Sequence, residues 1–158
     1  MRGPCEAAGA ALVERLGPGG VLLGVVLAEA SPVPLAGEPL LYLGLRGGLS
    51  LPAVALLGCV GNLLAAALSY ACGAALRPLG LVERALGARR APAEDVVRRR
   101  GAWGLVIASL TPLPFGTLAW VAGALRLPLV PYALACTVRV PKVLIYLAAM
   151  EAGWALGG

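Results

Sequence analysis

The sequence predicts an all-α membrane protein built as an inverted repeat, in which each half contains one broken, re-entrant helix and one transmembrane helix. Of its 158 residues, 59% are hydrophobic and only 13% are charged, and the mean hydropathy is +0.86. Soluble domains carry about 25% charged residues, so lipid is the expected solvent. The Ser-Pro-Val-Pro sequence at residues 31–34 returns as Thr-Pro-Leu-Pro at residues 111–114, an offset of 80 residues that Gly24 and Gly104 share. Paired, proline-interrupted apolar segments in two halves are typical of transporter folds.

A single membrane domain is expected over residues 1–158. Its first half covers about residues 19–76, a basic loop covers residues 77–101, and its second half covers about residues 102–150. Residues 1–17 hold four charged side chains around an Ala/Leu run. They are predicted to form either a short helix at the membrane interface or a frayed tail, because the segment is too short and too charged to span.

The first broken segment covers residues 19–45 and is interrupted at Pro32 and Pro34. Its apolar arm, residues 20–31, would reach about 18 Å as a helix, which is half a bilayer. Proline lacks a backbone donor and restricts the residue before it, so the chain is predicted to enter, break and return. Such a backbone is tolerated at membrane depth only where protein or a wet cavity surrounds it.

Residues 50–76 carry no charge and are predicted to form a tilted transmembrane helix. Asn62 and Tyr70 are its notable polar members. Small residues recur along it at steps of three and four: Gly58, Gly61, Ala65, Ser69 and Gly73. Such a stripe lets another helix approach closely.

The loop at residues 77–101 contains seven arginines and three acidic residues, and the positive-inside rule places it in the cytoplasm. Leu79, Val82 and Leu86 share one helical face, which predicts that this face lies on the anionic leaflet. Nucleic-acid binding is not expected, because no aromatic residue occurs between Tyr70 and Trp103.

The second half repeats the pattern. Residues 102–125 form a segment broken at Pro112 and Pro114, and residues 129–150 form the last predicted span. Two topologies fit the charges. If the broken segments are re-entrant, each half crosses once and the halves are oppositely oriented; if they cross as kinked helices, there are four spans.

Four ionisable side chains occupy apolar surroundings: Glu29, Glu38, Arg139 and Lys142. An unpaired charge at mid-bilayer costs at least about 2.5–3.5 kcal/mol, and these four sum to zero, so they are predicted to meet where the halves pack. The acids would bind a proton or cation, with the bases as counter-charges or as a grip on an anionic group. The alternative is that the charges lie near the membrane surface, with Arg139 and Lys142 snorkelling.

Further polar residues are predicted to line this site: Asn62, Tyr70, Arg126 and Tyr146. Arg139, Lys142 and Tyr146 share one helical face. Enzyme signatures are missing: the chain has no histidine, no phosphate-binding loop and no Gly-x-Ser-x-Gly motif. We therefore expect no enzymatic activity, no cofactor and no metal site; the four cysteines show no CxxC spacing.

The pattern of Glu29, Pro32, Pro34 and Glu38 resembles the DedA/VTT (SNARE-associated Golgi protein) superfamily, in particular its short YqaA-like branch. Four further stretches resemble family motifs: Gly61-Asn62 with Ser69-Tyr70, the tract at residues 100–104, Ala-Gly-x-x-Arg at residues 122–126, and residues 139–146. The second break departs from the family: residues 114–117 read Pro-Phe-Gly-Thr and lack its polar residue.

The resemblance implies a multi-pass protein of the bacterial cytoplasmic (inner) membrane with two re-entrant loops. The function it implies is a transporter or a translocase of a lipid or lipid carrier, with proton coupling as an option, that supports membrane homeostasis. A phospholipid or a polyprenyl phosphate would be the substrate. The alternatives are a non-transporting scaffold or assembly factor, whose small-residue stripe docks partners, and a small exporter. With only 158 residues to enclose a cavity, a homodimer is also an option.

Overall fold

The computed structural model describes residues 4–31, 37–110 and 115–157, and every regular element within them is helical. The all-α prediction is therefore confirmed. The four prolines predicted to mark the breaks, Pro32, Pro34, Pro112 and Pro114, lie outside the described residues.

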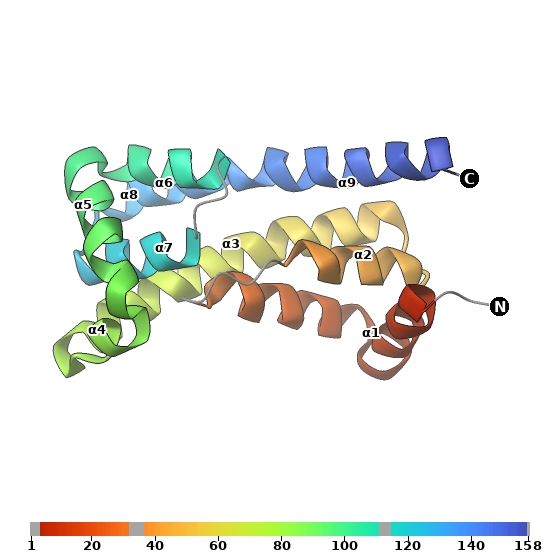
Figure 1. Cartoon of the computed structure of the whole chain (residues 1–158), viewed down its shortest axis with the longest axis horizontal. Helices are drawn as coiled ribbons and strands as arrows, with labels where there is room; N and C mark the ends of the chain where they lie inside the picture. Colours follow the sequence, from red (N-terminus) through yellow and green to blue (C-terminus); the bar gives the residue numbers. More distant parts are fainter. Residues whose placement is uncertain (1–3, 32–36, 111–114, 158) are drawn as a thin grey trace.

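The first half forms a helical hairpin followed by a long helix. Helix α1 (Pro4–Ala30) is kinked at Gly17, whose φ of 61° and ψ of −166° are readily adopted only by glycine. Helix α2 (Glu38–Arg46) turns back along α1, and α3 (Leu51–Leu76) then runs the length of the molecule (Figure 1). The kink separates the short N-terminal helix from the apolar arm, as predicted.

The basic segment forms a cap of short helices: η1 (Arg77–Leu79), α4 (Leu81–Leu86), η2 (Gly87–Arg89) and α5 (Arg90–Arg100). The predicted leaflet-facing surface is wrong for Val82 and Leu86, which are only 1% and 3% exposed. Both belong to the core cluster that includes α7 residues, while Leu79 is exposed. The charged side chains lie outside: Glu94 pairs with both Arg90 and Arg98.

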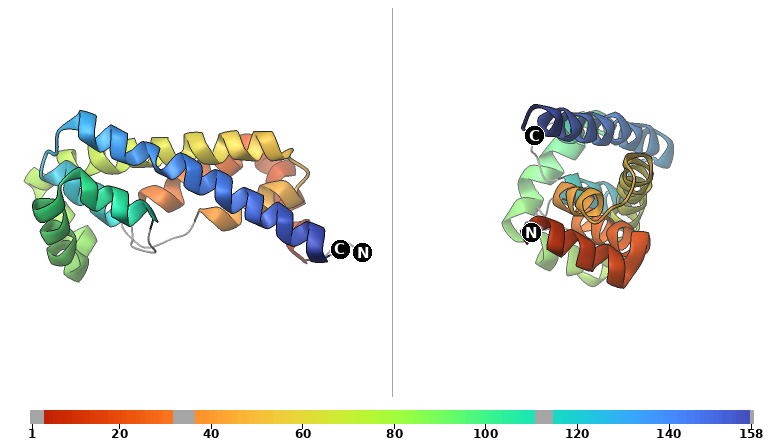
Figure 2. Two further views of the ribbon diagram at one scale, coloured as in Figure 1. Left: turned by 90° about the horizontal axis from the view of Figure 1, so that it is seen from above. Right: turned by 90° about the vertical axis from the view of Figure 1, so that its right-hand side faces the viewer.

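The second half also contains a pair of short helices followed by a longer helical stretch. Helices α6 (Ala102–Leu110) and α7 (Phe115–Ala124) form a second hairpin, whose outer ends lie at the end of the molecule occupied by α4 and α5 (Figure 1). The outer ends of the α1–α2 hairpin lie at the other end, near both chain termini (Figure 2). The last segment, predicted as one span over residues 129–150, is divided at Val138 into α8 (Leu129–Thr137) and α9 (Arg139–Gly157).

The two halves match through the turns that end α2 and α7. After α2, the Leu49 amide donates to the Gly44 carbonyl oxygen, and the Gly48 amide donates to the Leu45 carbonyl oxygen. After α7, the Leu127 amide donates to the Ala122 carbonyl oxygen, and the Arg126 amide donates to the Gly123 carbonyl oxygen. This is the Schellman pattern of a helix C-terminus. Its two copies are 78 residues apart, two fewer than the offset of 80 between the proline pairs, so the second half has two residues fewer between its proline pair and this turn. Arg126 is thus equivalent to Gly48 and not to Arg46, which precedes it by 80 residues.

The stripe of small residues on α3 is buried against the chain's own helices. A Cβ added at Gly73 would overlap the Trp120 carbonyl oxygen, and a Cβ added at Gly123 would overlap the Tyr70 carbonyl oxygen. Helices α3 and α7 therefore cross with their backbones in contact. The predicted close approach is confirmed, and its partner lies within the same chain.

Two stretches are long and apolar enough to cross a membrane by length and composition, Leu51–Leu79 and Leu129–Met150. Large apolar side chains cover their outer surfaces: Leu56 on α3 is 64% exposed and Ile145 on α9 is 69% exposed. Monomeric soluble proteins rarely expose contiguous apolar patches of large size. The surface of the long helices is therefore suited to lipid.

Candidate functional site

The end of α1 meets the start of α9 through a buried ion pair. Nη2 of Arg139, the first residue of α9, binds the Glu29 Oε2 atom. The two side chains are 3% and 11% exposed. The other carboxylate oxygen of Glu29, Oε1, accepts a hydrogen bond from the Gly37 backbone amide at 3.2 Å, just before α2 begins. Glu29 thus links both arms of the first hairpin to the last helix.

Asn62 on α3 fixes the orientation of the Arg139 guanidinium. Its Oδ1 atom accepts hydrogen bonds from Arg139 Nε at 2.9 Å and from Nη2 at 2.5 Å. Its Nδ2 atom donates to the Gly58 carbonyl oxygen at 2.9 Å, which determines which end of the amide faces the arginine. Asn62 was predicted only as a polar lining residue; the structure makes it the arginine's anchor.

Phe115, the first residue of α7, covers one face of the guanidinium. The Arg139 Cζ atom lies 4.0 Å from the centroid of the Phe115 ring, within cation–π distance. Arg139 therefore contacts α1, α3 and α7 at once. One of its nitrogens, Nη1, is buried and has no hydrogen-bond partner among the described residues. A buried donor without a partner costs about 1–3 kcal/mol, so this nitrogen is suited to an anionic oxygen.

A second, more open ion pair lies beside the first. Lys142 Nζ lies 3.2 Å from Glu38 Oε1, and the side chains are 42% and 20% exposed. A cavity of about 10 Å³, room for about one water molecule, lies beside these charges. Its polar lining residues are Glu29, Glu38, Asn62, Lys142 and Tyr146. The structure thus brings together all four predicted charged residues, and Tyr146, into one cluster, which we call the charge cluster.

Two of the predicted lining residues lie elsewhere. The Tyr70 hydroxyl donates to the Leu127 carbonyl oxygen at 2.6 Å, at the turn after α7. Arg126 lies in that turn and adopts a left-handed φ of 54°. Both residues therefore lie at the turn that follows α7, and α7 ends at the end of the molecule occupied by α4 and α5 (Figure 1).

The sequence analysis did not single out Phe115 or Gly37. Phe115 is the only phenylalanine in the chain and directly follows the second proline pair, which is the signal that would have drawn attention to it. The C-terminal end of α1 was also unforeseen: the Ala30 carbonyl oxygen accepts from Ser69 Oγ at 3.4 Å and from Trp120 Nε1 at 2.9 Å. These donors satisfy the carbonyl where the helix stops, as an apolar setting requires.

Residues 32–152 match the model of the VTT domain family. The chain belongs to this family, which is the DedA/SNARE-associated Golgi protein family. The matched range of the VTT domain includes Glu38, Asn62, Arg139 and Lys142, whereas Glu29 precedes it. VTT domains are membrane-associated, in agreement with the two long apolar stretches. No curated protein and no solved structure matches the chain.

Proposed function

We propose that this VTT protein is a multi-pass transporter of the bacterial cytoplasmic membrane that moves a lipid or lipid carrier with an anionic headgroup, coupled to protons. The observation that carries the proposal is the buried Arg139, which is paired with Glu29 and held by Asn62 while its Nη1 atom lacks a partner among the described residues. A phospholipid or a polyprenyl phosphate offers the anionic oxygens that such a guanidinium binds.

The arrangement of the helices supports a membrane-embedded inverted repeat. The α1–α2 and α6–α7 hairpins extend inward from opposite ends of the molecule, and α3 and the α8–α9 pair run past them (Figure 1). The part of α1 after Gly17 would reach about 20 Å, roughly half a bilayer. The hairpins would therefore be re-entrant and meet near the middle of the membrane, with the charge cluster at the junction.

The Glu29 carboxylate and the anionic headgroup would compete for the same guanidinium, and a proton on Glu29 would decide between them. A proton on Glu29 removes the negative charge opposite Arg139 and leaves the charge cluster with a net charge of +1. A headgroup oxygen then binds Arg139, and the nearby Lys142 provides a second positive charge. The proton and one negative charge of the headgroup cancel, which lowers the cost of holding the cargo in a medium of low dielectric constant. Loss of the proton restores the Glu29–Arg139 pair and displaces the headgroup.

The experiment is reconstitution into liposomes with a fluorescent phospholipid or a polyprenyl phosphate in one leaflet, with and without a pH gradient. We expect translocation by the wild type and its loss in Glu29→Gln and Glu38→Gln. The matched control is Glu83→Gln, which removes an acid that pairs with Arg90 outside the charge cluster at 2.9 Å. Wild-type rates in both cluster variants, at equal amounts of folded protein, would exclude the two acids from the mechanism.

The scaffold alternative is less well supported. It relied on the small-residue stripe of α3 as a docking surface for partner helices. Gly61 instead packs on Val25 of α1, where an added Cβ would meet the valine side chain at 2.9 Å, and Gly73 packs on α7.

A further inference from the structure

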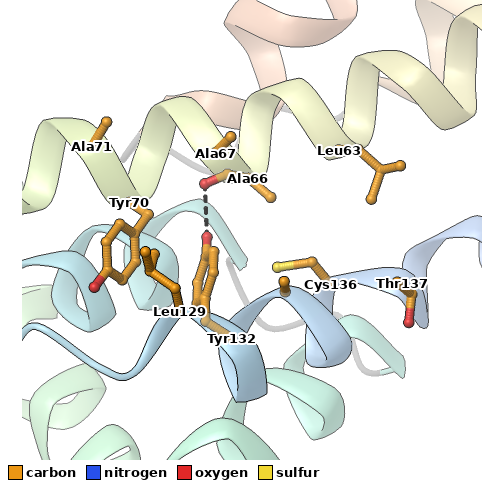
Figure 3. Close-up of a pocket in the computed structure, with 10 residues that line it drawn as sticks. Leu63, Ala66, Ala67, Tyr70, Ala71, Leu129, Tyr132, Cys136 and Thr137 are labelled. Carbon is orange, nitrogen blue, oxygen red and sulfur yellow. Dashed lines mark hydrogen bonds between the residues drawn. The ribbon is translucent and has the colours of Figure 1, made fainter.

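A second site lies outside the charge cluster, in a cavity of about 510 Å³ between α3 and α8 (Figure 3). Its volume falls within the range of small-molecule pockets, roughly 300–1,000 Å³. Neither the family match nor the proposed mechanism assigns this cavity a role. We call it the α3–α8 groove.

The groove is open because small residues form its sides. On α3, Ala67 and Ala71 follow Leu63 at four-residue steps; on α8, Ala133 lies between Leu129 and Thr137 at the same spacing. Residues four apart lie on one face of a helix, so each helix contributes one row of side chains along the groove. Larger side chains at the alanine positions would fill the space.

The polar atoms on the lining are already engaged. The Tyr132 hydroxyl donates to the Ala66 carbonyl oxygen at 2.7 Å, across the floor of the groove (Figure 3). The Tyr70 hydroxyl donates to Leu127, and Thr137 Oγ1 donates to the Leu134 carbonyl oxygen at 2.7 Å. None of the described residues that line the groove is charged. An occupant therefore gains apolar contact there and no strong hydrogen bond, which is the chemistry of a hydrocarbon chain.

The position of the groove relates it to the charge cluster. It lies between two stretches that are long and apolar enough to cross a membrane, so it is accessible to lipid. Its Thr137 end lies two residues before Arg139.

We propose that the α3–α8 groove binds one hydrocarbon tail of a membrane lipid. This inference rests on the proposed function in one respect: it places the headgroup end of that lipid beside Arg139.

The experiment uses photocrosslinking in liposomes that contain phosphatidylglycerol with a diazirine on one acyl chain. In the wild type we expect crosslinked peptides from α3 and α8. In Ala67→Trp and in Ala133→Trp, which fill the groove, we expect crosslinks to the groove-lining residues to fall severalfold, whereas crosslinks to the exposed outer surface of α3 persist. The matched control is Leu64→Trp on α3, at an exposed position that does not line the groove, where the crosslinks should persist.

Unchanged crosslinks in both groove variants would overturn the proposal. The oligomeric state gives a second outcome that would overturn it. If the wild type is a dimer and the groove-filling variants are monomers, the groove holds a second copy of the chain and not a lipid tail. Thermal unfolding checks that each variant is folded, and Ala67→Leu with Ala133→Leu replaces the tryptophan variants if these unfold.

The assay measures binding without transport, so the two proposals fail separately. Groove crosslinks that persist alongside normal translocation by Glu29→Gln would refute only the proposed mechanism. The opposite outcome would refute only the tail site. In that case Glu29→Gln loses translocation, but the groove-filling variants keep their crosslinks.

Discussion

Arg139 joins α9 to three other helices, at the end of α1, the middle of α3 and the start of α7. It pairs with Glu29, binds Asn62 and stacks on Phe115. The composition alone predicted that the intramembrane charges should compensate one another. The identity of each pair was not predictable, because Glu29 and Arg139 are separated by 110 residues and local spacing carries no information about such contacts.

The two ion pairs should differ in their contribution to stability. We expect Glu29→Leu to lower the free energy of unfolding by about 3–5 kcal/mol, because it leaves a buried, uncompensated guanidinium. Glu38→Leu should cost less, since the side chain of its partner Lys142 is 42% exposed, against 3% for Arg139. Reversible unfolding in detergent measures both. Equal losses would contradict the difference in burial.

The helix ends provide a second test at the level of single residues, since Gly48 and Arg126 occupy equivalent left-handed positions with φ of 95° and 54°. Gly48→Ala should lower the free energy of unfolding by about 1 kcal/mol, and Arg126→Gly should raise it by up to about 1 kcal/mol. Thermal melts of the two variants should therefore shift in opposite directions. A loss of stability in Arg126→Gly would mean that the arginine side chain contributes more than its backbone strain costs.

At the scale of elements, the long helix and both broken segments were predictable. Residues 50–76 were predicted as a span from their lack of charge, and α3 covers Leu51–Leu76. The division of the last segment at Val138 was not predicted, because the apolar run continues through it. Val82 and Leu86 were misplaced for a related reason: an apolar helical face fits a protein core as well as a membrane surface.

The crossing of α3 and α7 should be the packing contact least tolerant of substitution. We expect Gly73→Ala and Gly123→Ala each to cost about 3 kcal/mol, because the added methyl meets a backbone carbonyl oxygen that has no room to move. Gly19→Ala is the control: no atom of the described residues lies within 4 Å of the place its methyl group would occupy, so the change should be neutral or slightly stabilising. Thermal unfolding and the folded yield after extraction report the result, and native-like Gly73→Ala and Gly123→Ala proteins would refute the close crossing.

At the scale of the whole molecule, the repeat was visible in the sequence but its register was not. The Pro-x-Pro pairs gave an offset of 80, whereas the helix ends repeat at 78, because the second half has two residues fewer between its proline pair and the end of its second hairpin helix. The charge cluster is not repeated either. All of its acids come from the first half and its bases from the second, so the site exists only where the halves meet.

The orientation of the halves can be tested by cysteine labelling in a variant whose four native cysteines are replaced by alanine. Ser50→Cys and Pro128→Cys stand before α3 and α8, and Arg89→Cys marks the basic cap. With re-entrant hairpins, a membrane-impermeant thiol reagent should reach Ser50→Cys from outside, and Pro128→Cys and Arg89→Cys only from the cytoplasm. Labelling of Pro128→Cys from outside would instead indicate four complete spans.

The distance along the chain between Glu29 and Arg139 also has a consequence for biosynthesis. The ribosome makes the acid 110 residues before the base, so the nascent first half enters the membrane without its counter-charge. Until α9 arrives, the Gly37 amide is the carboxylate's hydrogen-bond partner from its own half. A chain truncated before residue 139 keeps the Glu29 carboxylate without its basic partner. This unpaired acid distinguishes an unfinished protein from a complete one and is a feature that quality-control proteases can recognise.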